Sequence, residues 1–251
     1  MSGVVRIALL AVFCGLVAAG GAGRAGAADA PPAPLQRQQV EAIIHDYLMQ
    51  HPDVLIAALR QAEDKLHKDD EAKASHAVVR NRQAVFNDPS TPVGGNPHGD
   101  VSIVEFFDYR CPYCKEVEPS LEAMVKQDPQ LRLVYKEFPI LGPVSVTAAH
   151  AALAAQNQGK YDAFHRAMMG VRGNITDETV YRVAASVGLN VDELKRDMAS
   201  PQIAQTIKDN MKLADALDIR GTPAFVIGDK VVPGAADLDT LKSMVAEARK
   251  Q

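Results

Sequence analysis

The sequence has 251 residues, of which 27 are basic and 31 acidic, giving a formal net charge of −4 at pH 7. This acidic balance argues against nucleic acid or an anionic membrane as the main partner. The length suffices for one well-cored domain with an appendage.

The first residues have the pattern of a secretory signal peptide. Arg6 supplies a positive charge, residues 7–19 are apolar, and residues 25–27 (Ala-Gly-Ala) fit a small-residue cleavage site. We predict a signal peptide over residues 1–27 and export to the periplasm. The apolar run is short for a bilayer-spanning helix, which argues against a retained anchor. Cys14 lies inside that run, which argues against a lipid anchor there.

A helical pattern follows in residues 36–83. Apolar residues recur at spacings of three and four, and Pro52 suits the first turn of a second helix. A helix over 53–83 would be roughly 45 Å long, more than the face of one small domain requires. We therefore predict an N-terminal helical arm over residues 28–84. Exposure of its apolar stripe would be unfavourable, so we expect homo-oligomerisation through residues 36–83. Docking of the arm on the rest of the chain, or its partial disorder, is the alternative.

The second region, residues 85–251, begins with a segment rich in turn-forming residues at 87–100. Apolar runs, helical periodicity and a hairpin signal at Gly228-Asp229 predict the elements that follow. These are a strand at 101–107, a helix at 112–126, a strand at 131–138, four or five helices within 144–218, short strands at 224–227 and 230–232, and a helix at 237–249. Strands and helices in this order predict an α/β domain with a helical insertion.

Two cysteines remain after signal cleavage, and they are only three residues apart. Such a pair closes almost no loop and is a poor stabilising disulfide, so it indicates a working site. Cys111 follows the predicted strand and opens the predicted helix, where free backbone N–H groups stabilise a thiolate. Such motifs lower a thiol pKa to about 3.5–7.5. We expect Cys111 to be the nucleophile and Cys114 to resolve the mixed disulfide. Pro112 and Tyr113 tune the relative stability of dithiol and disulfide.

A metal site is the alternative interpretation of the cysteine pair. Structural zinc needs four Cys or His ligands, the chain has no second C-x-x-C, and His150 and His165 do not stand at a zinc-finger spacing. Monovalent copper accepts two thiolates and stays open at Cys111 and Cys114. We expect no other cofactor.

Two further positions bear on the redox pair. Glu105 lies in the apolar strand, six residues before Cys111, and shares a strand face with Phe107. Burial would raise its pKa and suit it to relay a proton to or from Cys114; an exposed edge residue is the alternative. Thr222-Pro223 precedes a strand, and base rates alone predict a trans peptide bond there.

The segment Val104–Cys114 (VEFFDYRCPYC), together with Gly221–Phe225 (GTPAF), resembles the DsbA-like branch of the thioredoxin superfamily. The resemblance covers residues from about 85 to 250. It implies a thioredoxin fold with an inserted helical domain at about 144–218, a cis bond before Pro223, peptide contacts from the Thr222 backbone, and a buried acid at Glu105.

The arm resembles the N-terminal region of ScsC-like members, suppressors of copper sensitivity, in which such arms can drive oligomerisation. Pro112-Tyr113 matches that group and isomerase-like relatives. Strongly oxidising members often carry a histidine where Tyr113 stands. The resemblance thus implies an enzyme that isomerises or reduces disulfides in exported cysteine-containing proteins and depends on a membrane redox partner. The alternatives are a monomeric disulfide oxidase and a periplasmic copper-binding protein using the same cysteines.

Overall fold

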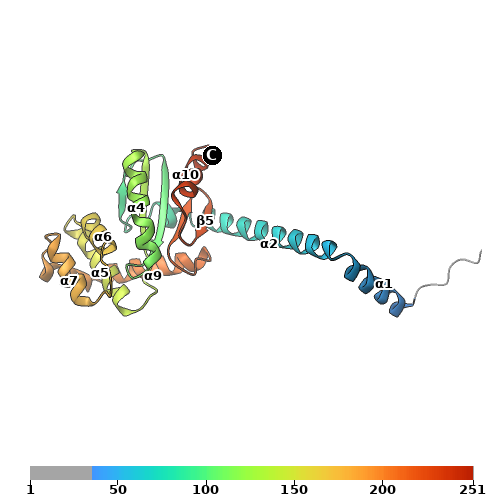
Figure 1. The fold of residues 1–251 in the computed structure, drawn as a ribbon. Helices are drawn as coiled ribbons and strands as arrows, with labels where there is room; N and C mark the ends of the chain where they lie inside the picture. The colour runs from blue at the N-terminus through green and yellow to red at the C-terminus, as the bar shows by residue number, and fades with distance from the viewer. Residues whose placement is uncertain (1–35, 251) are drawn as a thin grey trace, which may run out of the picture. The chain divides into compact units, whose positions relative to one another are not determined.

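The computed structural model describes residues 36–250 (Figure 1). The predicted signal peptide, residues 1–27, lies outside the described residues. The helices and strands are α1 (Arg37–Gln50), α2 (Pro52–Arg80), α3 (Arg82–Phe86), β1 (Val93–Gly95), β2 (Val101–Phe107), α4 (Pro112–Gln127), β3 (Leu131–Glu137), α5 (Pro143–Asn157), α6 (Tyr161–Met169), α7 (Asp177–Ser186), α8 (Val191–Met198), α9 (Pro201–Ala216), β4 (Ala224–Ile227), β5 (Lys230–Pro233) and α10 (Leu238–Ala248).

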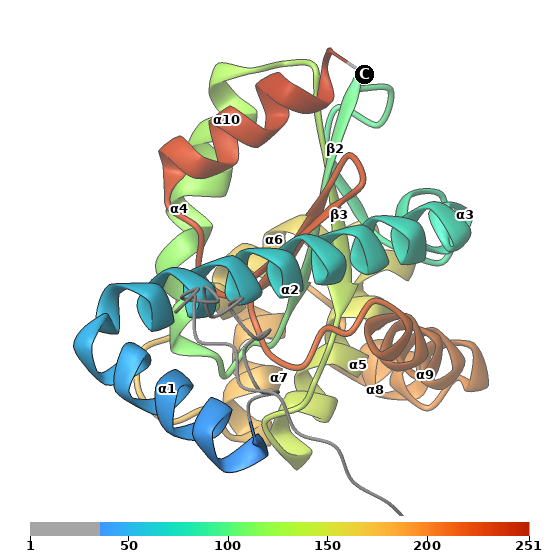
Figure 2. The same cartoon turned by 90° about the vertical axis from the view of Figure 1, so that its right-hand side faces the viewer.

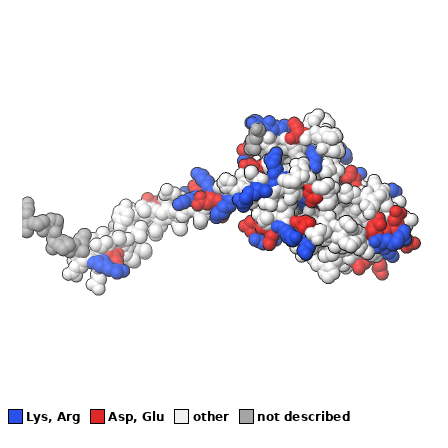
Figure 3. All heavy atoms as spheres, turned by 180° about the vertical axis from the view of Figure 1, so that it is seen from behind, with Lys and Arg blue, Asp and Glu red and all other residues white. Residues whose placement is uncertain are grey.

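The chain divides into two compact units, one up to Ala57 and one from Ala58 onward. The described part of the first unit is α1 and the first turn of α2. Helix α1 ends at Gln50 because His51 precedes Pro52, and the residue before a proline disfavours the helical conformation. No residue of α1 is buried. Charged side chains are sparse along α1 and the start of α2 on the face seen in Figure 3. The exposed large apolar residues of this unit are Val40, Ile43, Ile44, Tyr47, Met49, Val54, Leu55 and Ile56.

The second unit is built on a five-stranded mixed sheet with the strand order β1-β3-β2-β4-β5. Strands β2 and β3 are parallel, and the other neighbours are antiparallel. The crossover between the parallel strands is α4, while α5 to α9 are inserted between β3 and β4. This is the α/β architecture with a helical insertion that the sequence predicts.

The central strand β2 divides the core into two layers because its side chains alternate between the sheet faces. Ile103 and Phe107 pack on one face with α4, α10 and the insertion. Val104 and Phe106 pack on the other face with α3, α9 and the last turns of α2. Burial on both faces explains the uninterrupted apolar run that marks this strand in the sequence.

The insertion is organised around α5, which packs against α6, α7, α8 and α9. Small side chains let it approach these neighbours closely, since Ala148, Ala151 and Ala152 are fully buried. Side-chain oxygens of Thr176, Asn190 and Ser200 accept backbone N–H groups at the starts of α7, α8 and α9. In Figure 2, α5, α7, α8 and α9 lie in the lower half, α6 lies at mid-height and α10 lies at the top.

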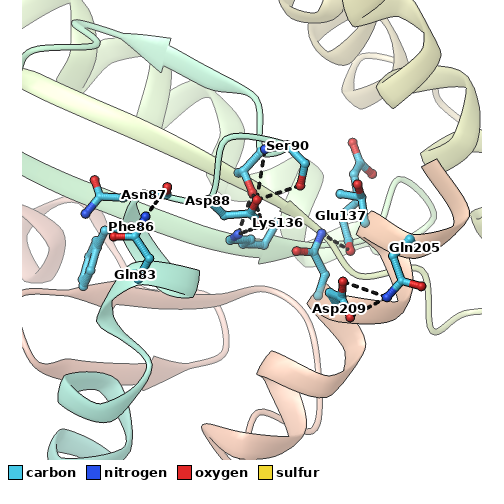
Figure 4. A network of polar contacts seen from close by, with 12 residues as sticks. Gln83, Phe86, Asn87, Asp88, Ser90, Lys136, Glu137, Gln205 and Asp209 are labelled. Carbon is cyan, nitrogen blue, oxygen red and sulfur yellow. Dashed lines mark hydrogen bonds and ion pairs between the residues drawn. The ribbon is translucent and has the colours of Figure 1, made fainter. Parts of the chain in front are cut away.

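A buried lysine fastens the segment before β1 to the sheet (Figure 4). The Lys136 side chain is fully buried, and its Nζ donates to Asp88 Oδ2 at 3.2 Å and to Thr91 Oγ1 at 2.6 Å. Ser90 donates to Asp88 from its backbone N–H at 3.0 Å and from its hydroxyl at 2.8 Å. Burial lowers the pKa of Lys136, and the Asp88 carboxylate opposes that effect. The pair therefore holds the chain between α3 and β1 on β3.

Two local features differ from the sequence predictions. Helix α2 ends at Arg80 and a separate short helix follows from Arg82, where one continuous helix to residue 83 was predicted. The turn-rich stretch 87–100 contains the three-residue strand β1, which pairs with β3. None of the helices within residues 36–250 has the length and hydropathy needed to cross a membrane.

Candidate functional site

The loop between β2 and α4 places Cys111 at the N-cap of α4, directly before the first helical residue. The Asp108 carboxylate accepts hydrogen bonds from the backbone N–H groups of Arg110 at 2.8 Å and Leu141 at 2.9 Å. The backbone carbonyl of Asp108 accepts a third hydrogen bond, from the backbone N–H of Cys111 at 2.9 Å. This turn makes Cys111 the N-cap of α4 and puts Pro112 in the first turn, where a proline loses no helical hydrogen bond. Pro112 and Tyr113 are exposed beside the pair, with Tyr113 60% exposed.

The two cysteines are free thiols with opposite environments. Hydrogen bonding from the Cys114 thiol is the main cause that lowers the pKa of Cys111 to about 6. The Thr222 side chain and the backbone N–H groups of Cys114 and Tyr113 add to it, and burial opposes it. The thiol form of Cys111 can donate to the Thr222 carbonyl at 3.2 Å. That contact favours the thiol form of Cys111. Its effect on the pKa is smaller than that of the groups that donate hydrogen bonds to the Cys111 sulfur. Cys111 is therefore largely a thiolate at neutral pH.

Cys114 is held as a thiol. Burial raises its pKa, and both the hydrogen bond to Cys111 and the charge of Glu105 add to the rise. Cys114 is 0% exposed and Cys111 is 3% exposed, so an incoming sulfur meets Cys111 first. The geometry thus separates an attacking thiolate from a protonated partner within one helical turn.

Glu105 is completely buried and lies on the same face of β2 as Ile103 and Phe107. Neither of its carboxyl oxygens has a hydrogen-bond partner within the described part of the chain. Burial raises its pKa well above the ordinary value, and the charges of Glu118, Cys111 and Glu137 add to the rise. Glu105 therefore lies within electrostatic reach of both sulfurs, in surroundings that disfavour its carboxylate form.

The loop before β4 brings a second segment to the cysteines. The Thr222–Pro223 peptide bond is cis, as the family resemblance implies and base rates alone do not predict. Thr222 is half-buried, and its carbonyl contacts Cys111. A cavity of about 310 Å³ lies beside this loop, lined by residues 217–224, by β5 and by His67, Asp70, Glu71 and Ala74 of α2. The structure thus brings Cys111, Cys114, Glu105, Thr222 and Pro223 together, with Pro112 and Tyr113 at the edge.

Comparison with known families gives a direct assignment. The model of the DSBA-like thioredoxin domain matches residues 102–246, and that of the copper resistance protein ScsC N-terminal domain matches residues 36–68. The chain belongs to the DsbA-like thioredoxin family. The second unit accordingly has the thioredoxin fold of a thiol–disulfide oxidoreductase, and the N-terminal helices correspond to those of ScsC.

Similar solved structures support this assignment. A thioredoxin-like oxidoreductase from Silicibacter pomeroyi DSS-3 is 50% identical, with a TM-score of 0.67 over 68% of this chain and 99% of that chain. A linker-deletion mutant of Proteus mirabilis ScsC is 29% identical, with a TM-score of 0.68 over 87% of this chain and 98% of that chain.

Among curated proteins, the Na⁺/H⁺ antiporter NhaA 1 of Salinispora arenicola is 27% identical over 158 residues, which is 62% of this chain. The match spans 24% of the antiporter's length, so the shared segment is a minor part of that protein.

The DsbA-like domain also contains a buried polar cluster that the sequence analysis missed. Glu137 Oε1 accepts the hydroxyl groups of Tyr109 at 3.1 Å and Tyr161 at 2.9 Å. Tyr109 Oη also lies 3.1 Å from His165 Nδ1, and His165 Nε2 lies 3.4 Å from Glu118 Oε2. Burial raises the pKa of Glu137, and the two tyrosine hydrogen bonds oppose that rise. The cluster joins the end of β3 to the insertion.

The only sequence signal for this cluster is a carboxylate, Glu137, at the end of an apolar strand. Its partners come from separate helices, and only the fold brings them together. No group of three or more His, Cys, Asp or Glu side chains in residues 36–250 is arranged to hold a metal ion.

Proposed function

We propose that this DsbA-like protein is a periplasmic thiol–disulfide oxidoreductase that isomerises or reduces disulfides in exported proteins. The observation that carries the proposal is the pairing of a Cys111 thiolate at the start of α4 with a buried, protonated Cys114. The predicted signal peptide supports the location. The lack of a histidine in place of Tyr113 favours isomerisation or reduction over strong oxidation.

In the first step, the Cys111 thiolate attacks one sulfur of a substrate disulfide. A Cys111–substrate disulfide forms, and the other substrate sulfur leaves as a thiolate. Cys111 loses its negative charge in this step. Because that charge helps to raise the pKa of Glu105, its loss lowers the pKa of Glu105, whose proton passes to the leaving substrate thiolate and leaves Glu105 as a carboxylate.

In the second step, Glu105 as a carboxylate takes the proton of Cys114, and the Cys114 sulfur attacks Cys111. The Cys111–Cys114 disulfide forms and the substrate leaves as a thiolate, with two electrons transferred to the substrate. If instead a substrate thiolate attacks the mixed disulfide, the substrate is rearranged and the enzyme returns reduced. Isomerisation follows this second route and needs Cys111 to start reduced, which requires a membrane electron donor.

Substrate binding is assigned to the segment around the cis proline. Backbone groups of Thr222 lie next to Cys111, and a cavity of about 310 Å³ lies beside Thr222 and Pro223. Pro112 and Tyr113 supply an exposed surface at the helix start. A peptide lying along Thr222 would present its disulfide to Cys111.

We further propose that the protein is a homo-oligomer formed through residues 36–83. Side chains such as Ile43 (57% exposed), Tyr47 (52%) and Leu59 (62%) find no cover within the described chain. Exposed apolar surface of this extent indicates a protein partner. An oligomer would place several redox sites around shared substrates, which favours shuffling of wrong disulfides over single oxidations.

The test compares the purified reduced protein with its Cys111→Ser and Cys114→Ser variants. We expect the wild type to reduce a small disulfide much faster than glutathione does and to reactivate scrambled ribonuclease. Cys111→Ser should abolish both activities, while Cys114→Ser should trap a mixed disulfide. A wild type no faster than glutathione would refute oxidoreductase function. Oxidation of reduced ribonuclease without reactivation of the scrambled form would favour the monomeric oxidase.

Copper binding is a second candidate, supported by the match to the N-terminal domain of a copper resistance protein. Two thiolates three residues apart are suitable soft ligands for monovalent copper. Titration of the reduced protein with Cu(I) against a competing chelator should give one tight site that is lost in Cys111→Ser. Equal weak binding by both proteins would reject this function.

A further inference from the structure

Three cationic side chains surround a cavity at the redox end of α4. The cavity, of about 400 Å³, is lined by Arg110, Lys115 and Arg172, together with Pro112, Glu116 and the backbone at 171–173. Arg110 precedes Cys111, Lys115 lies one turn after it on α4, and Arg172 comes from the loop between α6 and α7. Three positive charges thus face one exposed carboxylate, Glu116, beside the nucleophile.

Backbone carbonyls hold these cations in place but do not neutralise them. Arg110 donates to the Leu141 carbonyl. Lys115 Nζ donates to the Val171 carbonyl at 2.5 Å, and Arg172 Nη1 to the Met169 carbonyl at 3.2 Å. Within residues 36–250, none of the three cations forms an ion pair with a carboxylate. The cavity therefore keeps a net positive charge with its donors oriented.

Two of the cations, Lys115 and Arg172, lie close enough to repel each other. Lys115 is half-buried; its pKa is lowered by burial and then by the charge of Arg172, and the buried Asp108 opposes this only in part. Hydrogen bonds from Cys114, Thr222 and backbone N–H groups stabilise the Cys111 thiolate. The thiolate therefore does not serve as the counter-ion of these cations. Three cations beside one exposed carboxylate leave an excess of positive charge, which an anion arriving from outside would reduce.

We propose that Arg110, Lys115 and Arg172 form a subsite for a carboxylate of the substrate, so that the enzyme prefers disulfides flanked by acidic residues. This inference rests on the proposed thiol–disulfide exchange and adds a substrate class to it. Lys115 stands four residues after Cys111, so the two lie on the same side of the helix. A substrate acidic residue close to the reacting cysteine can thus reach the subsite while its sulfur reaches Cys111.

The probes are two short peptides, each with one cysteine joined to 2-thiopyridine in a mixed disulfide. One peptide has glutamate on both sides of the cysteine and the other has glutamine. The Cys111 thiolate attacks the peptide sulfur, a Cys111–peptide disulfide forms, and 2-thiopyridone leaves. Cys114 then attacks Cys111 and releases the peptide thiolate. Released thiopyridone absorbs light, which suits a protein that has no tryptophan for a fluorescence signal.

The variants are Lys115→Gln and Arg172→Gln, with Lys126→Gln as the control because it removes one exposed charge near the other end of α4. The quantity compared is the ratio of the two peptide rates for each protein, so differences in overall reactivity cancel. We expect the wild type to favour the glutamate peptide by about fivefold at low salt, because exposed ion pairs each contribute little. Each test variant should lower the preference by at least half, and Lys126→Gln should leave it unchanged.

The outcomes distinguish this inference from the proposed function. Equal rates for both peptides in the wild type, or an equal loss of preference in Lys126→Gln, would overturn the subsite while leaving exchange intact. No reaction with either peptide would reject the exchange function itself. Thiolate absorbance of the test variants gives a further check. An unchanged Cys111 titration together with a lost preference places the effect on the peptide carboxylate.

Discussion

Two helical regions of this chain are rich in apolar residues, and they differ in whether the chain covers them. In α5, Ala148 and Ala152 are fully buried among the other insertion helices. In α1 no residue is buried, and Ile43 and Tyr47 are more than half exposed. Apolar side chains stabilise a protein only when something removes them from water. The comparison teaches that the apolar residues of α5 are covered by neighbouring helices of the same unit, whereas those of α1 have no cover within the described residues.

The largest expected effect comes from placing negative charges on the apolar side chains of α1. The double variant Ile43→Asp, Tyr47→Asp should convert the oligomer to a monomer in light scattering, because an interface cannot bury unpaired carboxylates. Reactivation of scrambled ribonuclease should fall about tenfold as local concentration is lost. Reduction of a small disulfide should stay within about twofold, because the redox pair lies in the other unit.

The matched control for the arm is Gln38→Asp with Gln50→Asp, two exposed polar positions of α1 that receive the same charge. This control should remain an oligomer. A monomeric wild type would contradict the proposed oligomer. An unchanged oligomer mass for the Ile43→Asp, Tyr47→Asp variant would mean that α1 does not form the interface.

The next effect is the pH dependence of Cys111. Because its pKa is lowered to about 6, exchange with a neutral disulfide should be nearly constant above pH 7 and fall about tenfold per pH unit below pH 5. The lowered pKa of Cys111 also stabilises the folded, reduced protein. This contribution to the unfolding free energy is complete at pH values above the ordinary thiol pKa, and it is lost as the pH falls towards 6. Thiolate absorbance gives the titration directly. The charged-arm variant should give the same curve, and a shifted curve would mean that the arm acts on the site.

A smaller effect is expected for Glu105→Gln. Because the pKa of Glu105 is raised in the folded protein, Glu105 favours folding most at pH values below the ordinary carboxyl pKa. Its contribution to the unfolding free energy then falls as the pH rises. The variant should therefore gain stability relative to wild type between pH 5 and pH 8, by about 1.4 kcal/mol for each unit of raised pKa titrated in that range. Urea unfolding of the reduced proteins measures it. A constant difference at both pH values would place Glu105 in an ordinary solvated environment.

The smallest effect is expected from Tyr161→Phe, which removes one hydrogen bond to Glu137 and no packing volume. The loss in unfolding free energy should be about 1 kcal/mol. The variant should be less destabilised at pH 5 than at pH 8, since the tyrosine bond favours ionised Glu137. An unchanged free energy at pH 8 would mean that the Tyr161 hydrogen bond adds no stability beyond the hydrogen bond that Tyr109 donates to Glu137.

The sequence predicts those parts of the fold that depend on local pattern. The apolar run of β2 and Pro112 at the start of α4 define these elements directly. Strand β1 was not predicted because it has three residues, two of them glycines, in a turn-rich stretch. Gly94 is required there by tertiary packing, because a Cβ would approach Tyr135 to 2.9 Å. The break at Asn81 has no glycine or proline to signal it, and follows instead from burial of Val85 and Phe86.

The candidate site divides in the same way. Glu105, Cys111 and Cys114 stand close in sequence, so strand alternation and helix periodicity suffice to bring them together. Thr222 and Pro223 were placed beside them by family resemblance, because no local pattern links residues a hundred positions apart. Arg172 and the Glu137 cluster depend on how the insertion packs against the sheet, which a single sequence does not encode in any short spacing.

The pairing of β2 with β4 has a mechanical consequence. Phe106 pairs with Ala224 and Glu105 with Phe225, so the strand that carries Glu105 is hydrogen-bonded to the residues directly after Pro223. In the proposed mechanism, a displacement of a client bound beside Pro223 would reach Glu105 through the hydrogen bonds of this strand pair. Strands β2 and β4 should therefore move as one rigid unit beneath the cysteines. Adjustment to bulky clients should then come from the helical insertion and the surface side chains around it.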